Sequence, residues 1–562
     1  MKETITLLLR TALDALRAEG ALPVAGRDDN IQVEAARDRA HGDYASNLAL
    51  TLAKSAGMNP RELAERLVKA LPDANAVSKV EIAGPGFINF FVNAGAAGEV
   101  IFDILEAGDD YGRNNDGGGQ KVQVEFVSAN PTGPLHVGHG RGAAVGDSLC
   151  RLLAANGYSV TREFYYNDAG AQIDNLTLSV AARLKGIEPN DPAWPKDGYR
   201  GEYIQDVAHA YMQGETVSAD DRRVTAAADP EDMAAIRAFA VAWLRHEQDL
   251  DLRAFGVEFD IFYLESSLYE SARVEATVEQ LIDGGHTYEA DGALWLRTTD
   301  FGDDKDRVMR KREGGYTYFL PDVAYHLDKW QRGFTTVINE QGADHHSTVT
   351  RVRAGLQALE AGIPAGWPEY VLHQMVLVTR SGEEVKLSKR AGDYVTLRDL
   401  IDEVGRDATR YFLVSRAATS QMTFDIDLAR SQSSDNPVYY AQYAHARVCS
   451  VEAKAAAEGK PFDADSAANA LHRLEDQREK ELLNRLGRWP EVVKRAASGR
   501  EPHQIAQYLQ ELASDFHSYY NAVRVMVDED ELRNVRLALG MAVRQVMRNG
   551  LDLLGVCAPR EM

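Results

Sequence analysis

The chain has 562 residues, of which 45% are hydrophobic and 26% charged, a composition typical of a soluble globular protein. This length exceeds what one hydrophobic core supports, so we expect three or four domains. The net charge of −23, from 85 acidic and 62 basic side chains, argues against a protein that coats nucleic acid non-specifically.

Three cysteines, Cys150, Cys449 and Cys557, are far apart and form no CxxC pair or Cys/His cluster. This spacing supports neither a disulfide framework nor a zinc site, and it favours the reducing cytoplasm. The N-terminal segment is an amphipathic helix pattern, unlike a signal peptide. Because no run of about 20 apolar residues is present, we expect no transmembrane helix and no membrane partner.

The first segment, residues 1 to about 115, is predicted to be a separate α/β unit. Helical periodicity covers 2–18 and 60–70, and strand-like runs at 77–82 and 87–92 are joined by a Gly-Pro-Gly turn, which indicates a hairpin or two adjacent strands. The polar, Gly-rich segment 109–119 is predicted to be the linker.

From Lys121 the pattern changes to strand, Gly-rich turn, helix and strand, predicted at 122–127, 138–156 and 158–166. This βαβ rhythm indicates a parallel sheet, and we expect a Rossmann-like catalytic domain over residues 120–380. Insertions are expected at about 185–315, with 185–230 as an insertion or irregular link. Strand-like segments return at 337–339 and 370–378.

The last part of the chain differs again in its pattern. Residues 381–435 contain a compact cationic loop, and from about residue 436 the apolar spacing is helical to the end of the chain. The predicted fold class is therefore multi-domain α/β, with an α/β N-terminal domain, a Rossmann-like parallel-sheet catalytic domain and an all-α C-terminal bundle over 436–562.

Two histidines, His136 and His139, lie where the first strand of the sheet turns into its helix. Backbone N–H groups and the helix dipole favour phosphate at such a place. Gly138 lets a nucleotide approach without a Cβ, and imidazoles can donate to phosphate oxygens as charge builds on the α-phosphorus. The alternative is a turn whose histidines are satisfied by neighbouring groups.

The same segment also fits a dinucleotide-binding fingerprint, G-x-G-x-x-A over residues 138–143, with Glu163 about twenty residues further on. This pattern predicts an NAD-dependent oxidoreductase. It gives no role to the histidines or to the lysines of the cationic loop.

That loop is Lys386-Leu-Ser-Lys389. Lysines on either side of Ser388 can bind a triphosphate as mobile point charges and can stabilise pyrophosphate as it forms. Taken alone, the string predicts only a solvated basic turn. Combined with the two histidines, it predicts a site that holds ATP while its α-phosphate is attacked, so amino-acid activation is the first hypothesis.

Candidate residues for a cationic substrate are Tyr318 and Asp322, which share one face if the chain is helical after Pro321. A carboxylate beside a phenol suits a guanidinium group, although Asp322 could instead cap a helix. Glu125, a charged residue in an apolar strand, needs either a cationic ligand at the carboxyl edge of the sheet or a structural Arg or Lys.

Two further motifs carry polar or aromatic groups. Asp344, after the strand-like 337–339, can accept hydrogen bonds from ribose hydroxyls, whereas the adjacent His345 and His346 lack other ligands, so we expect no resident metal. Near residue 440, aromatic side chains can stack on unpaired RNA bases or pack into the bundle core. The residues concerned are Tyr439, Tyr440, Gln442 and Tyr443.

Together these motifs resemble a class I aminoacyl-tRNA synthetase, specifically a bacterial-type arginyl-tRNA synthetase. Residues 129–139 are similar to the HIGH region, and 386–390 to the KMSKS loop, with Leu387 and Arg390 in place of Met and the final Ser. Further similar segments are 41–47, 84–89, 124–130, 166–170 and 549–555, so the resemblance spans nearly the whole chain.

The resemblance implies ligation of L-arginine to tRNA(Arg) through an arginyl-adenylate by a cytoplasmic monomer. Residues implied around arginine are Glu125, Ser128, Asn130, His136, Tyr318 and Asp322. Those implied for ATP with Mg²⁺ are His136, Gly138, His139, Gly342, Asp344, Lys386, Ser388 and Lys389. Ala343 stands where the family often has Gln, which removes one polar contact to arginine.

The resemblance also implies the division of labour along the chain. Residues 1–115 would contact tRNA, 381–435 would contact its stem, and 436–562 would bind the anticodon through the tyrosine-rich helix. Three alternatives stay open: a nucleotidyltransferase that adenylates a small carboxylate without tRNA, an NAD-dependent oxidoreductase, and a non-catalytic RNA-binding paralogue.

Overall fold

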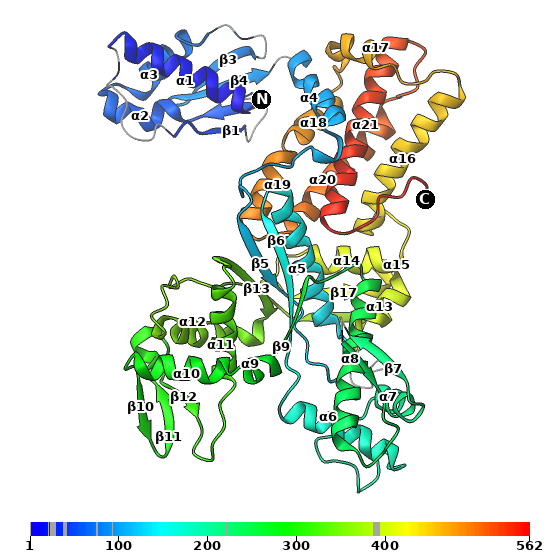
Figure 1. The fold of residues 1–562 in the computed structure, drawn as a ribbon. Helices are drawn as coiled ribbons and strands as arrows, with labels where there is room; N and C mark the ends of the chain where they lie inside the picture. Colours follow the sequence, from blue (N-terminus) through cyan, green and yellow to red (C-terminus); the bar gives the residue numbers. More distant parts are fainter. Residues whose placement is uncertain are drawn as a thin grey trace.

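The protein is described by a computed structural model for residues 2–20, 22, 30–36, 42–72, 74, 77–92, 94–219, 222–385 and 394–562. Figure 1 shows a small N-terminal α/β unit, a central sheet domain with two lobes and a C-terminal helical bundle. The predicted fold class is confirmed. Within the described ranges, no helix combines the length and the apolarity that crossing a membrane requires.

The N-terminal unit packs three helices on an antiparallel sheet of order β1-β2-β4-β3. The helices are α1 (Lys2–Ala18), α2 (Leu48–Ala56) and α3 (Pro60–Lys69), and the strands are β1 (Val33–Ala35), β2 (Tyr44–Ser46), β3 (Val77–Ala83) and β4 (Phe87–Val92). The predicted hairpin is confirmed as the β3–β4 pair. Helix α3 begins where Pro60 fixes its first turn and the Asn59 side chain accepts the N–H of Arg61.

The sheet of this unit ends at Val92, and the next helix belongs elsewhere. Helix α4 (Ala94–Ala107) packs against α18 and α21 of the C-terminal bundle. The expected linker is also engaged there, because the Trp489 indole donates to the carbonyl of Tyr111 at 2.9 Å. The N-terminal unit therefore ends near Val92, before the boundary expected near residue 115. The glycines of segment 109–119 allow its backbone to approach the C-terminal bundle closely, so this segment is not a free linker. A Cβ on Gly112 would lie 2.3 Å from Nε1 of Trp489.

The central domain has a parallel sheet of order β14-β13-β5-β6-β9. Its strands are β5 (Lys121–Glu125), β6 (Ser159–Tyr166), β9 (Ile261–Leu264), β13 (Thr336–Gly342) and β14 (Glu369–His373), and α5 (Val137–Ala155) connects β5 to β6. The chain continues from β5 toward β6 on one side and returns to β13 on the other. The carboxyl ends of β5 and β13 thus form a topological switch point, where open α/β sheets bind ligands.

Two lobes interrupt the sheet, one on each side of β9 in sequence (Figure 1). The first contains α6 (Ala171–Leu184), α7 (Tyr203–Met212), β7 (Thr216–Ala219), β8 (Arg222–Thr225) and α8 (Met233–Ala254). The second contains α9 (Ser266–Glu270), α10 (Arg273–Asp283), β10 (Thr287–Ala290), β11 (Ala293–Leu296), β12 (Arg307–Arg310) and α11 (Phe319–Gln331). Residues 185–230 thus form part of an insertion that contains a helix and a hairpin, because α7 buries apolar side chains such as Ile204 and Tyr211 in the lobe core.

The single strand predicted at 370–378 is wrong, because two strands in different sheets occupy it. Strand β14 ends at His373, and β15 (Val376–Arg380) pairs with β16 (Glu383–Glu384) and β17 (Met422–Asp425). Between them the N–H of Gln374 donates to the carbonyl of Ala418 at 2.8 Å. Because both strands are rich in apolar residues, the sequence pattern runs on without interruption and does not reveal the break between β14 and β15.

Helices follow to the end of the chain. Helix α12 (His346–Ala358) covers the sheet, and α13 (Leu397–Val404), α14 (Arg406–Val414) and α15 (Ile426–Arg430) lead to the bundle. The bundle comprises α16 (Pro437–Ala457), α17 (Ala464–Asn469), α18 (Gln477–Gly487), α19 (Trp489–Ser498), α20 (His503–Ala522) and α21 (Asp530–Leu553). The predicted helical end of the chain is confirmed.

A buried ion pair joins the bundle to the sheet domain. The guanidinium of Arg410 on α14 donates to Asp147 of α5 at 2.5 Å, to the carbonyl of Leu554 at 3.0 Å and to that of Phe255 at 3.0 Å. A Cβ on Gly555, whose φ is +66°, would lie 2.4 Å from this guanidinium. The tail after α21 is therefore fixed against α5.

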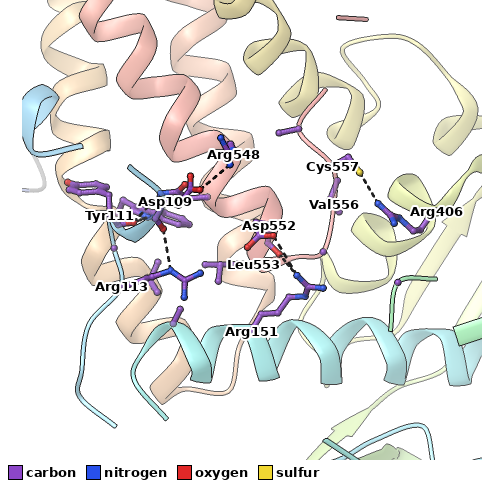
Figure 2. Close-up of a pocket in the computed structure, with 18 residues that line it drawn as sticks. Asp109, Tyr111, Arg113, Arg151, Arg406, Arg548, Asp552, Leu553, Val556 and Cys557 are labelled. Atoms are coloured by element: carbon purple, nitrogen blue, oxygen red, sulfur yellow. Dashed lines mark hydrogen bonds and ion pairs between the residues drawn. The ribbon is translucent and has the colours of Figure 1, made fainter. Parts of the chain in front are cut away.

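Beside this pair lies a cavity of about 490 Å³ between the two domains. In Figure 2, Arg151 extends from α5 toward Asp552 of α21, and Arg406 points to Cys557 on the tail. Arg151 also donates to Asp147 at 2.9 Å. Residues that line the cavity thus add further contacts between α5, α21 and the C-terminal tail.

Replacing Asp147 by Asn should lower the free energy of unfolding by about 3–5 kcal/mol, because the buried Arg410 charge loses its counter-charge. Urea denaturation monitored by circular dichroism measures this loss. The matched control is Asp552→Asn, which alters an exposed partner of Arg151 and should change the free energy by less than about 1 kcal/mol. Equal losses in the two variants would contradict this account of the junction.

Candidate active site

The chain leaves β5 through a strained turn. Val127 and Ser128 have φ values of +67° and +42°, a conformation that is costly for a β-branched residue and is often found at functional sites. The hydroxyl of Ser128 donates to Glu125 at 2.9 Å and accepts the N–H of Tyr165 at 3.2 Å. These hydrogen bonds fix the turn, which places Ser128 and Asn130 at the carboxyl edge of the sheet, just after the end of β5. Asn130 donates to Gln172 at 2.6 Å.

The two motif histidines cap the N-terminus of α5 reciprocally. The N–H of His139 donates to Nδ1 of His136 at 3.2 Å, and the N–H of His136 donates to Nδ1 of His139 at 3.3 Å. Their rings stack with centroids 3.6 Å apart. Because each Nδ1 accepts, the neutral rings carry their protons on Nε2, and these N–H groups are available as donors to a phosphate.

Burial keeps both of these histidines neutral. It lowers the pKa of His136 to about 4, with the nearby His373 adding to the effect and Asp344 opposing it. The pKa of His139 is lowered well below its ordinary value by burial, His136 and His373. His136 and His139, the histidines of the His-x-Gly-His sequence (the HxGH pair), therefore supply hydrogen-bond donors without positive charge.

The glycines of the dinucleotide-like fingerprint have packing roles. A Cβ on Gly138 would lie 2.9 Å from the His136 ring, one on Gly140 2.9 Å from Leu397, and one on Gly142 2.6 Å from Glu340. Glu163 is fully buried and paired with Arg332 at 2.6 Å, so it cannot receive a ribose. The geometry thus argues against the NAD-dependent alternative.

Glu125 has a structural partner. Lys329 of α11 donates to its carboxylate at 2.5 Å and to Asn339 at 3.0 Å, and all three side chains are buried. The sequence left open whether this charge meets a ligand or a structural lysine, and Lys329 is the counter-charge within the protein. Glu125 also accepts from Ser128, so both of its oxygens are engaged.

Asp322 differs from Glu125 in its electrostatics. Burial, Glu265 and Glu125 raise its pKa from 3.8 to about 7, and Arg351 and Lys329 only partly oppose them. The alternative that Asp322 caps α11 is wrong, because Tyr318 is the N-cap residue and Asp322 lies within the first turn. Tyr318 is 67% exposed. Asp322 itself is half-buried, and a carboxyl group with so strongly raised a pKa marks a candidate binding site for a cation.

Sequence reasoning missed two neighbours of Asp322. The Tyr165 hydroxyl donates to Glu265 at 2.7 Å, and burial raises the pKa of Glu265. Glu265 directly follows β9, and Tyr165 is near the end of β6. Their positions at the carboxyl ends of parallel strands were the available signal. With Asp322 and Glu125 they form an acidic cluster, whose effect on the pKa of Asp322 is only partly offset by Arg351 and Lys329.

The carboxyl end of β13 carries the remaining predicted groups. Asp344 is exposed and lies 3.5 Å from His345, and a Cβ on Gly342 would lie 2.4 Å from the Asp344 carboxylate. Glu340 and His373, which form a buried pair beside them, were missed. Across the residues that the structure covers, no group of three or more His, Cys, Asp or Glu could hold a metal.

The predicted Lys386, Ser388 and Lys389 lie outside the described residues, as do Arg390 and His41. The chain that follows the cationic loop returns to the histidine turn. The N–H of Val137 donates to Val395 at 3.1 Å, and that of Leu397 donates to Leu135 at 2.8 Å. Residues 395–397 therefore lie directly beside His136.

Comparisons with known proteins agree with this arrangement. The model of the tRNA synthetases class I (R) catalytic domain matches residues 101–434, that of the arginyl tRNA synthetase N terminal domain matches 3–92, and that of the DALR anticodon binding domain matches 441–562. The chain belongs to the arginyl-tRNA synthetase family.

Individual relatives cover the whole chain. Proteins named arginine–tRNA ligase from Geotalea uraniireducens and Geotalea daltonii are each 60% identical over 100% of both chains. The solved arginyl-tRNA synthetase of Thermus thermophilus has a TM-score of 0.73 at 23% identity, covering 99% of this chain and 100% of that one. This last likeness shows the fold.

On the α16 helix of this family member, the predicted RNA-binding residues have contacts within the protein. The ring of Tyr440 packs on that of His517 with centroids 4.3 Å apart, and the rings of Tyr439 and Tyr443 stack with centroids 5.7 Å apart. Gln442 donates to Asp407 at 3.0 Å and to Cys557 at 2.9 Å. The three tyrosines and Gln442 are half-buried, so they combine packing with a partly open face.

The titration of Asp322 should be visible in protein stability. Because its pKa is raised from 3.8 to about 7, the cost of its charge is absent below pH 3.8, grows with rising pH and is complete above pH 7. Asp322→Asn should therefore stabilise the protein on the order of 2 kcal/mol more at pH 8.5 than at pH 5.5. Urea denaturation at both pH values measures this difference.

The control for this measurement is Asp206→Asn, at an exposed position on α7, which should change stability equally at both pH values. A gain from Asp322→Asn that is independent of pH would contradict the raised pKa.

Proposed function

We propose that this chain ligates L-arginine to tRNA in two steps. The arginine carboxylate attacks the α-phosphate of ATP, giving arginyl-adenylate and pyrophosphate, and the terminal ribose hydroxyl of tRNA then takes the arginyl group. The observation that carries the proposal is the half-buried Asp322, whose pKa is raised to about 7 beside two buried acids. Relatives 60% identical over the full length are named for this reaction.

The acidic cluster around Asp322 provides the basis for choosing arginine. Asp322 and Glu265 offer carboxylates to a cationic group of the substrate, and a cation that arrives there removes the mutual repulsion that raises the pKa of Asp322. Glu125, balanced by Lys329, acts through Ser128 by fixing the strained turn. Asn130, Tyr318 and His136 complete the arginine site in this proposal.

The helix N-terminus of α5 receives ATP. The Nε2–H groups of His136 and His139 donate to the phosphate chain, Gly138 keeps the approach open, and Gly342 and Asp344 face the ribose. Lys386, Ser388 and Lys389 stabilise pyrophosphate as it leaves. Mg²⁺ enters as the ATP complex. No side-chain nucleophile is needed, so catalysis rests on positioning and charge stabilisation.

Three parts of the chain bind tRNA in this proposal. The N-terminal unit and the region 381–435 contact the body and stem of tRNA, and the bundle over 436–562 binds the anticodon. The half-buried Tyr439, Tyr440, Gln442 and Tyr443 contribute their open faces. The residues matched by the N-terminal and anticodon-binding family models, 3–92 and 441–562, support this division.

Aminoacylation of total bacterial tRNA with each of the twenty amino acids, in the presence of ATP and Mg²⁺, tests the function directly. Charging with arginine alone is expected. Charging with a different amino acid would overturn the roles of Asp322 and Glu265, and an absence of charging would reject the proposed activity.

Asp322→Ala should raise the KM for arginine about tenfold or more, because a charge-assisted contact is lost, while the KM for ATP changes by less than about twofold. Steady-state aminoacylation measures both constants, with Asp206→Ala as the surface control. Equal increases for the two substrates would show that Asp322 does not contact arginine.

A further inference from the structure

A third histidine lies beside the HxGH pair, held by a buried acid. His373, the last residue of β14, is the register neighbour of Gly342 on β13. Its Nδ1 lies 2.5 Å from the Glu340 carboxylate, and the two side chains are only 13% and 1% exposed. A ring fixed through Nδ1 directs Nε2 away from Glu340. This Nε2 would lie 3.9 Å from a Cβ on Gly342, at the carboxyl edge of the sheet.

Helix α5 is shaped to accept this pair. A Cβ on Gly142 would lie 2.6 Å from the Glu340 carboxylate and 3.4 Å from Cε1 of His373. The adjacent Arg141 fixes the chain after His373, donating to the carbonyl of Gln374 at 2.6 Å and to that of Ser420 at 2.8 Å. Gly142, which belongs to the segment that fits the dinucleotide-binding fingerprint, thus makes room for the His373–Glu340 pair.

The pKa values of the three histidines at this edge are shifted in different directions. Burial alone would lower the pKa of His373, but the Glu340 carboxylate outweighs it and raises the pKa. His136 and His139 are shifted in the opposite direction. The charged and titratable groups that face His373 are Glu340 on β13, Arg141, His136 and His139 on α5, and Asp344 after β13.

We propose that His373, positioned by Glu340, contacts the α-phosphate of bound ATP through its Nε2–H and stabilises the negative charge that builds there during adenylate formation. This inference rests on the proposed function. His136 and His139 then act as neutral donors, while the Glu340 carboxylate favours the protonated form of His373. Glu340 is a positioning residue, because it acts through the imidazole.

The first test uses His373→Asn in the full chain, with ATP varied at saturating arginine and tRNA, and arginine varied at saturating ATP and tRNA. We expect kcat/KM for ATP to fall about tenfold or more, as for the loss of a charge-assisted hydrogen bond, and the KM for arginine to stay within about twofold. The inhibition constant of AMP, which carries an α-phosphate, should rise about tenfold, while that of adenosine should not change.

The second test uses pH. In the unaltered protein, kcat/KM for ATP should fall as pH rises through the pKa of His373, because the imidazolium loses its proton. Glu340→Gln removes the counter-charge, so the fall should begin at lower pH. His373→Asn should lack this limb of the profile. A structural role for the pair would lower activity at every pH without moving the limb.

The matched control is His286→Asn, which breaks a His–Glu pair with Glu360, 3.1 Å apart, on the remote lobe. It should leave every one of these constants unchanged. If His373→Asn does not fold, as judged by thermal unfolding, the shift in Glu340→Gln carries the test.

Several outcomes would overturn the proposal: an unchanged kcat/KM for ATP, an equal rise of the AMP and adenosine inhibition constants, or a limb that stays in place in Glu340→Gln. Charging activity in the unaltered protein separates these outcomes from a failure of the proposed function.

Discussion

The close approach of helix α5 to the parallel sheet is the constraint on which the active site depends. Glycines permit it: a Cβ on Gly146 would lie 2.3 Å from the Phe126 ring, and Gly140 and Gly142 leave similar space for Leu397 and Glu340. The helix N-terminus thereby reaches the switch point between β5 and β13. There the first turn of the helix and its two histidines meet the carboxyl ends of the strands.

Charge is distributed unevenly around this helix terminus. On one side, the half-buried Asp322 lies near Glu265, Glu125 and Lys329, and burial together with repulsion from the two glutamates raises its pKa. On the other side, burial lowers the pKa of His136 and His139, while Glu340 raises the pKa of His373. In the proposed function, the acidic side would accept the cationic group of the amino acid and the histidine side the phosphate of the nucleotide.

The other end of α5 is tied to the C-terminal bundle. Asp147 receives Arg410, Arg151 and Arg162, and Arg410 also holds the carbonyl of Leu554 on the tail. Because α5 carries the histidine cap at its first turn and this ion pair further along, one rigid helix connects the nucleotide site with the bundle. The cavity beside it (Figure 2) is lined by residues of both domains.

The sequence by itself determined the class of fold, the βαβ unit around His136 and His139, the N-terminal hairpin and the helical C-terminus. These features are local: periodicity, glycine turns and caps depend on residues close together in the chain. From the spacing between Tyr318 and Asp322, the sequence also predicts that Asp322 binds a cationic substrate.

Only the tertiary structure decided which charges meet. Glu125 with Lys329, Glu340 with His373, and Asp147 with Arg410 are separated by 204, 33 and 263 positions, so no pattern in the sequence joins them. The break between β14 and β15 and the attachment of α4 to the bundle have the same origin. In each case the partner comes from a distant segment, and burial against that partner sets the pKa, the strand boundary or the domain to which a helix belongs.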